Sequence, residues 1–200
     1  MEILKRLYGS LIFDCARKGF SRAIPVFVWL GGSVEKTVEG MTPLLIAALN
    51  NQADAVRVLV IAGANLEQAD STSRSPLACA VTRRAFAAAE ELLKSGASLH
   101  WRDSHGHGLL HLAVLDGDIH TVRWLLDKGV NANDVEPATG ATPLMLACSR
   151  SKPEVVKALL EGGADVELTD RCGHDAIAFA HSRNDNAITA LVATALPIKS

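Results

Sequence analysis

Thr42-Pro43-Leu44 is a three-residue phrase that returns along the chain at an interval close to 33 residues. Its counterparts, at offsets of 33, 33 and 34 residues, are Ser75-Pro76-Leu77, Gly108-Leu109-Leu110 and Thr142-Pro143-Leu144. A glycine follows 21 residues after the first residue of each phrase, at Gly63, Gly96, Gly129 and Gly163. Because two signals keep the same phase, the period predicts a chain built from repeated structural units.

Each unit is expected to hold two helices. Thr42, Ser75 and Thr142 can cap a helix N-terminus through the side-chain oxygen, and the proline that follows suits a first turn, where no amide hydrogen is needed. The second helix has apolar residues at i, i+1, i+4 and i+5, as in the stretch 55–60. The four glycines stand where this helix should end in a left-handed conformation.

The period and these phrases resemble the ankyrin repeat, a β-turn followed by two antiparallel helices. The resemblance implies an all-α solenoid of stacked helix-turn-helix units with short β-turn or hairpin tips. It predicts a single domain over residues 1–200, whose first and last repeats are degenerate caps. The expected repeats span approximately residues 5–36, 37–69, 70–102, 103–136, 137–169 and 170–200.

The first repeat departs most from this pattern. The stretch from Ser10 to Gly19 aligns with the helix-start phrase of the family, which places Ser10 at the beginning of a helix. Pro25 falls within the expected second helix and should shorten or kink it. Trp29 can cover the open end of the stack.

Composition favours one soluble, elongated domain. The 200 residues are 48% hydrophobic and 21% charged, with a net charge of −2 and a pI near 6.4, which argues against a nucleic-acid partner. No apolar stretch is long enough for a membrane span, and the N-terminus lacks the apolar core of a secretory signal. The four cysteines show no paired spacing, so we expect reduced thiols and a cytoplasmic protein.

The sequence predicts no catalytic site and no cofactor. It contains no nucleophile elbow, phosphate-binding loop, zinc-protease helix or dinucleotide-binding glycine pattern. An enzyme whose catalytic residues are distant in sequence and meet only in the folded chain is a less favoured alternative. The densest group of potential metal ligands is His105, His107 and His111. We recognise no cysteine or carboxylate beside them at ligand spacing, so no metal site is expected. The family resemblance assigns His111 to hydrogen bonds between repeats.

The resemblance places partner binding on a concave strip formed by the turn tips and the first helices. Three of its residues, Met41, Leu49 and Leu115, are apolar where the packing pattern does not require it, although each can also belong to local packing. The strip includes Trp101, an aromatic residue that suits either an interface anchor or packing along its own hairpin. The expected partner-binding residues are Met41, Leu49, Asn50, Arg74, Arg83, Arg84, Trp101, His105, His107, Leu115, Asp116, Arg150 and Arg183.

Four of these residues, Arg83, Arg84, Arg150 and Arg183, recur at matching positions of successive repeats. A guanidinium makes forked hydrogen bonds to carboxylates, so they predict a protein partner with an acidic patch. The alternatives are a solvated charged face or pairing within the chain with Asp116 and Asp118.

These features together predict a non-catalytic protein–protein interaction module that acts as an inhibitor, an immunity-type protein or an adaptor. The second alternative is a homo-oligomeric structural subunit. It rests on the nearly uncharged C-terminal run 187–198, with Ile188, Leu191, Val192, Leu196 and Ile198, which is unlike a polar cap and can support self-association. Folding back of this tail onto the chain is the rival explanation.

Overall fold

A computed structural model describes residues 2–150 and 152–195, so Leu196 and Ile198 of the predicted apolar tail lie outside the described residues. Helices dominate this part of the chain, and its only extended pairings are two isolated bridges, Val38 with Met41 and Arg102 with Gly108. The prediction of an all-α fold is therefore confirmed. The helices are α1 (Glu2–Lys18), α2 (Ile24–Trp29), α3 (Pro43–Leu49), α4 (Ala53–Ile61), α5 (Pro76–Thr82), α6 (Phe86–Lys94), α7 (Leu109–Asp116), α8 (Ile119–Asp127), α9 (Pro143–Ser149), α10 (Pro153–Glu161), α11 (Ala176–Ser182) and α12 (Asn186–Thr194).

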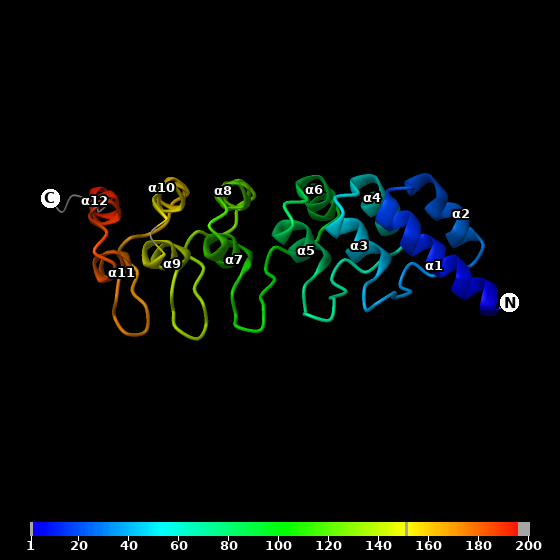
Figure 1. Cartoon of the computed structure of the whole chain (residues 1–200), viewed down its shortest axis with the longest axis horizontal. Helices are drawn as coiled ribbons and strands as arrows, with labels where there is room; N and C mark the ends of the chain where they lie inside the picture. The colour runs from blue at the N-terminus through cyan, green and yellow to red at the C-terminus, as the bar shows by residue number, and fades with distance from the viewer. Residues whose placement is uncertain (1, 151, 196–200) are drawn as a thin grey trace. The chain divides into compact units, whose positions relative to one another are not determined.

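The chain divides into two compact units, residues 1–101 and 102–200, which are described separately. Within the second unit, α7, α9 and α11 form one row, α8, α10 and α12 form another, and the connecting turns extend from the side of the first row (Figure 1). Within the first unit, α3 packs on α5 and α4 on α6 in the same manner. Each unit therefore presents a face made of turns and first helices.

The predicted helix starts are present in both units. The Leu45 amide donates to Thr42 Oγ1 at 3.2 Å, and Ser75 accepts from the Ala78 amide at 3.2 Å. Thr142 accepts from Met145 at 3.3 Å. The proline after each cap lies in the first turn, as expected. These short helices begin at a fixed residue, which in turn fixes the position of each preceding turn.

The predicted glycine stops are also confirmed. Gly63, Gly96, Gly129 and Gly163 have φ between +81° and +93°. A Cβ atom at any of them would meet no heavy atom within 4 Å. Glycine is therefore needed for its left-handed backbone conformation and not for space.

The first repeat differs from the prediction at its start. Helix α1 begins at Glu2, and Ser10 lies in its middle, where the Ser10 hydroxyl donates to the Arg6 carbonyl at 3.2 Å. The assignment of Ser10 to a helix start was wrong because the preceding stretch of leucine, lysine and arginine is itself a good helix former. Pro25 lies in the first turn of α2, which has only 6 residues, so the expected shortening is confirmed.

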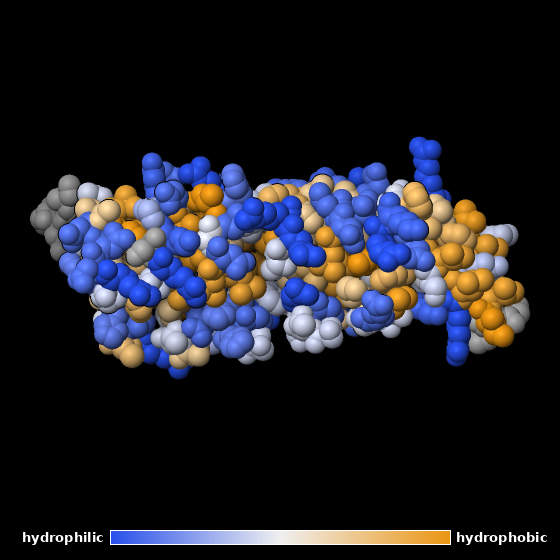
Figure 2. All heavy atoms as spheres, viewed as in Figure 1, coloured by the Kyte–Doolittle hydropathy of each residue, from blue (hydrophilic) through white to orange (hydrophobic). Residues whose placement is uncertain are grey.

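The N-terminal end of the first unit carries exposed apolar side chains. Hydrophobic surface covers this end of the unit in Figure 2. Trp29 is 84% exposed and Ile3 is 83% exposed. The expectation that Trp29 covers the end of the stack is therefore wrong, because this ring is itself uncovered. The other large apolar residues exposed on α1 and α2 or directly after α2 are Leu4, Leu7, Val26 and Leu30.

Candidate protein-binding surface

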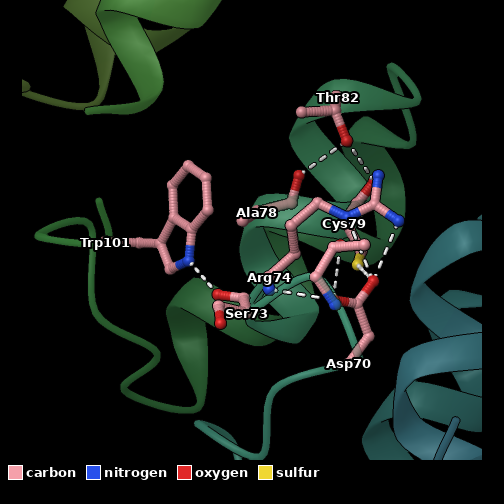
Figure 3. Close-up of polar contacts among 8 residues, drawn as sticks. Asp70, Ser73, Arg74, Ala78, Cys79, Thr82 and Trp101 are labelled. Atoms are coloured by element: carbon pink, nitrogen blue, oxygen red, sulfur yellow. Dashed lines mark hydrogen bonds and ion pairs between the residues drawn. The ribbon is translucent and has the colours of Figure 1, made fainter. Parts of the chain in front are cut away.

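Arg74 lies in a turn whose first residue, Asp70, organises the backbone of the loop (Figure 3). Asp70 Oδ1 accepts from the amides of Thr72 and Arg74, both at 2.9 Å. Its second oxygen, Oδ2, accepts from Arg74 Nε at 3.0 Å and from the terminal nitrogen at 2.9 Å. Burial alone raises the pKa of the Asp70 carboxyl, but these hydrogen bonds outweigh it and hold the pKa at about 2. Arg74 is therefore engaged within the chain.

Trp101 packs against this same turn. Its ring nitrogen donates to the Ser73 carbonyl at 2.7 Å, and the side chain is half-buried (Figure 3). This hydrogen bond joins Trp101 to the turn at the start of its own repeat, residues 70–102, and the role of Trp101 as an interface anchor stays a prediction. Ser73 has φ of +62°, a left-handed conformation that is strained for a residue other than glycine.

His105 and His107 lie in a turn of the second unit that has the same backbone arrangement. Asp103 Oδ1 accepts from the amides of His105 and His107, at 2.9 and 2.8 Å. The other carboxylate oxygen, Oδ2, lies 3.1 Å from His107 Nδ1 and 3.7 Å from His105 Nδ1. Burial raises the pKa of Asp103, but the hydrogen bonds from the two histidines together lower the pKa by more than burial raises it, so the net shift is downward. The structure therefore brings these two histidines together around one carboxylate.

Asp103 is a further potential metal ligand in this turn. The statement that no carboxylate stands at ligand spacing was wrong, since Asp103 precedes His105 by two residues and His107 by four. The signal was available in the sequence, but the return of both side chains toward one oxygen depends on the turn, which helix periodicity does not describe. His111, the third histidine considered, does not join this group.

His111 is fully buried in the second unit. Its Nε2 lies 3.4 Å from the Ala141 carbonyl of the next repeat, which confirms the expected role between repeats. Its Nδ1 has no hydrogen bond and lies 3.8 Å from Asp134 Oδ2. Burial lowers the pKa of His111, so the ring is neutral at neutral pH. Asp134 accepts from Arg102 at 2.5 Å, and Arg102 donates to the Gly106 carbonyl, which joins this turn to the loop between α8 and α9.

The three apolar residues of the predicted strip are less exposed than expected. Met41, Leu49 and Leu115 are all half-buried. The backbone of Met41 pairs with that of Val38 in a short bridge. Each side chain therefore contributes to local packing and leaves only part of its surface for a partner.

Three arginines occupy equivalent positions, directly after the first helix of their repeats. Arg83 follows α5, Arg150 follows α9 and Arg183 follows α11. Arg83 and Arg150 are exposed, and neither guanidinium group makes a hydrogen bond or an ion pair with another residue in the described parts of the chain. Arg183 Nε donates to the Ser149 carbonyl at 2.7 Å. Arg84, the neighbour of Arg83, is exposed with φ of +57°.

The acidic residues considered as internal partners of the arginines behave differently from each other. Asp116 is the exposed last residue of α7. Asp118 is buried and caps α8, with one oxygen accepting from the His120 amide and the other from the Thr121 hydroxyl.

Asn50 is the residue directly after α3, and its side-chain amide donates to the Ile46 carbonyl at 2.8 Å. The predicted residues thus include members bound within the chain and members open to solvent.

The cysteines also separate into two groups. Cys15, Cys79 and Cys148 are buried and Cys172 is exposed. Burial raises the pKa of Cys79 and of Cys148 to about 12, so these thiols stay protonated at neutral pH. No disulfide joins the four residues, which are all described.

Two hollows lie on the surface of the described residues, and neither contains a recognisable catalytic arrangement. One hollow, between α8 and α10, is lined by Arg123, Asp127 and Glu161 together with apolar residues and a glycine. Another lies at residues 19–23 and offers a serine and an arginine. Neither pairs a nucleophile with a histidine base. Among the described helices, none has the length and apolar character needed to span a membrane.

Paired short helices, side-chain caps at the first helix and left-handed glycines after the second define the class of helical-repeat proteins. A family model described as "Ankyrin repeats (3 copies)" matches residues 12–103, 85–170 and 110–197. The chain belongs to the ankyrin repeat family. Members of this family generally mediate protein–protein interaction, and the fold is typically a non-enzymatic binding module.

The curated relatives are longer proteins. Mouse (Mus musculus) Rabankyrin-5 is 35% identical over 158 residues, which make up 76% of this chain and 13% of the relative. The mouse B-cell lymphoma 3 protein homolog is 31% identical over 157 residues, 76% of this chain and 34% of the relative. This chain therefore spans about a third or less of the length of these relatives.

Solved structures share the fold over most of the chain. The ankyrin repeat domain of Bcl-3 matches with a TM-score of 0.82 and 25% identity, covering 92% of this chain and 85% of that one. A chain in the complex of a Bdellovibrio bacteriovorus predatory endopeptidase with an immunity protein matches with a TM-score of 0.72 and 26% identity, covering 92% and 96%. Both likenesses confirm the ankyrin-repeat solenoid.

Proposed function

We propose that this chain binds a folded protein partner whose acidic side chains contact the arginines after the first helices. The observation that carries this proposal is the state of Arg83 and Arg150. Both guanidinium groups are exposed, and both lack a partner among the described residues. A guanidinium group presents a planar fork of donors that matches a carboxylate. Arg74, in contrast, is held by Asp70 and supports the turn that carries it.

The remaining predicted residues are proposed as the surroundings of these contacts. Met41, Leu49 and Leu115 expose part of an apolar side chain, which adds contact area next to the charged groups. Trp101 is half-buried and fixed by its bond to Ser73, so little side-chain freedom is lost on binding. The short, hydrogen-bonded turns keep their shape, and this favours rigid-body binding.

The finer role that we propose is that of an inhibitor, an immunity-type protein or an adaptor, which acts by covering or tethering its partner. The support is the likeness to a chain in the endopeptidase and immunity-protein complex, where the match covers 96% of that chain. A cytoplasmic setting and a non-catalytic mode of action belong to the same proposal.

Affinity capture from the native host, followed by a charge-reversal comparison, tests this function. Arg83→Glu combined with Arg150→Glu should weaken binding of the captured partner by at least about tenfold at low salt, which is ~1.4 kcal/mol. The control is Lys94→Glu combined with Lys157→Glu, which changes the net charge equally but alters cations on the second helices α6 and α10. Equal affinities of the two double variants would refute the arginine contact.

Self-association is the competing function, and its C-terminal basis has little support in the described residues. On α12, Ile188 and Val192 are buried and Leu191 is half-buried, while the exposed residues of this helix are small or polar. Most of the exposed large apolar side chains lie on α1 and α2, namely Ile3, Leu4, Leu7, Val26 and Trp29. The mass of the purified chain in solution, measured by light scattering, separates a monomer that binds a partner from a homo-oligomer.

A further inference from the structure

Three turns of this protein share one backbone arrangement, in which an aspartate Oδ1 accepts from the amides of the residues two and four positions later. The aspartates are Asp70, Asp103 and Asp170, and all six distances lie between 2.8 and 2.9 Å. This bonding fixes the carboxylate and leaves the second oxygen, Oδ2, facing the side chain at the fourth position. The identity of that side chain then decides what Oδ2 can do.

In the Asp103 turn, Oδ2 meets two imidazole rings. Its distances to Nδ1 of His107 and of His105 are 3.1 and 3.7 Å, and the two rings stack with centroids 5.8 Å apart. The potential ligand atoms of the three residues all lie within 4.8 Å of one another. Tetrahedral zinc with bonds of about 2.0–2.1 Å needs neighbouring ligand atoms about 3.3 Å apart. The observed separations from Oδ2 bracket that value.

We propose that Asp103, His105 and His107 form a binding site for a divalent transition-metal ion of the zinc type. One carboxylate oxygen and two imidazole nitrogens are ligands that zinc accepts, and water would fill the fourth position. The backbone amides that bind Oδ1 orient the carboxylate, which is the usual task of groups around metal ligands. His105 is exposed and His107 is 21% exposed, so an ion reaches the site from solvent without any opening of the fold.

The turn itself makes the ligand arrangement compact. Gly106, between the two histidines, has φ of +87°, and this left-handed residue turns the chain so that both rings return toward Asp103. Arg102 donates to the Gly106 carbonyl at 2.8 Å and to Asp134 at 2.5 Å, so its charge is engaged by another carboxylate. The site does not use Arg83 or Arg150, so its ion binding can be measured on the chain without a protein partner.

The Asp170 turn is a related arrangement that must be removed before binding is measured. Cys172 stands at the position of His105, and His174 Nδ1 lies 3.5 Å from Asp170 Oδ2. A full-length background with Cys172→Ser and His174→Ala eliminates its thiol and imidazole. Zinc titration of this background by calorimetry should then report one ion per chain.

Two further substitutions in that background test the ligands. His105→Ala and His107→Ala should each weaken zinc binding by at least about tenfold, the lower end of losses seen when groups that only support metal ligands are changed. His120→Ala, which removes an exposed imidazole from α8, should leave the affinity unchanged. Circular dichroism and the urea midpoint without zinc confirm that each variant is folded.

Imidazole nitrogen resonances give a second, direct readout. On addition of zinc, the 15N shifts of His105 and His107 should move together and saturate at one equivalent, while those of buried His111 should move little. The proposal is overturned if the background chain binds no zinc, or if His105→Ala and His107→Ala bind zinc as tightly as the background. It is also overturned if the two imidazoles do not respond.

Discussion

The Asp70 and Asp103 turns have the same hydrogen-bonded backbone but present different side chains to the second carboxylate oxygen. In the Asp70 turn a guanidinium makes two hydrogen bonds to Oδ2, and the ion pair is complete within the loop. In the Asp103 turn two imidazole rings face that oxygen. One turn geometry can therefore hold an internal ion pair or present a set of potential metal ligands, depending on the side chains two and four positions after the aspartate.

The largest expected effect on stability comes from removing the aspartate of the Asp70 turn. Asp70→Ala should lower the free energy of unfolding by about 2–3 kcal/mol, because two backbone amides and Arg74 lose their acceptor. Asp103→Ala should lower it by about 1–2 kcal/mol, since no arginine pairs with that carboxylate in the turn. Urea unfolding measures both. Equal losses would show that Arg74 at Asp70 Oδ2 contributes no more to stability than His107 does at Asp103 Oδ2.

Acid should remove the contribution of the Asp70 carboxylate to the stability of the fold. The pKa of Asp70 is about 2 in the folded chain, below its ordinary value of 3.8, so its contribution of about 2 kcal/mol is present above pH ~4. This contribution is lost as the pH falls from about 4 toward 2 and the carboxylate takes up a proton. Unfolding measured over this range should show a smaller acid loss in Asp70→Asn than in the wild type. Parallel curves for the two chains would contradict the assignment.

Gly106→Ala tests the left-handed residue of the Asp103 turn. Its φ of +87° is unfavourable for any residue with a Cβ atom, and that atom would lie 2.8 Å from Pro137 Cδ. We expect a loss of about 1–2 kcal/mol in thermal or urea unfolding. The control is Gly140→Ala in the next turn, which has φ of +77° and a nearest contact of 3.2 Å, so its loss should be smaller. A loss at Gly140 that exceeds the loss at Gly106 would contradict this steric argument.

Exchanging the side chains between the turns should exchange their properties. Thr72→His combined with Arg74→His gives the Asp70 turn the ligand types of the Asp103 turn. At pH 8 we expect a stability loss of about 1 kcal/mol, because the forked ion pair disappears. Calorimetry should also detect one additional zinc ion per chain. If the exchanged chain binds no additional zinc, the turn geometry is not sufficient for metal binding.

The smallest expected effect is a gain in stability at Ser73. This residue has φ of +62°, where the Asp103 turn has glycine. Ser73→Gly should raise the free energy of unfolding by about 0.5–1 kcal/mol, because glycine adopts this conformation without steric strain. The Ser73 carbonyl can still accept from Trp101, so Trp101 fluorescence should be unchanged. A destabilised variant would show that the serine side chain is needed in the turn.

The sequence was sufficient for those parts of the fold that local chemistry decides. Thr42, Ser75 and Thr142 cap helices because a short hydroxyl side chain reaches the amide three residues later. It was insufficient at Ser10, where a favourable helical sequence on the N-terminal side extended α1 to Glu2. The start of a helix depends on a competition between a cap and its preceding residues, and a repeat alignment contains no measure of that competition.

The candidate site was predictable in its residue types but not in its contacts. The arginines after the first helices follow from the repeat period, and the structure places three of them at equivalent positions. The engagement of Arg74 by Asp70, and of Trp101 by Ser73, depends on loop backbone angles and on contacts between the two ends of one repeat. Periodicity of apolar residues is silent about both, because loops have no regular period.

The distribution of thiols makes the native chain suitable for site-specific labelling. Cys172 alone is exposed, whereas Cys15, Cys79 and Cys148 are buried and the last two have pKa values near 12. A maleimide fluorophore should therefore attach at one position without any engineered cysteine. Under denaturing conditions three more thiols become reactive, so the number of dyes per chain reports the fraction of molecules that have kept their packed interior.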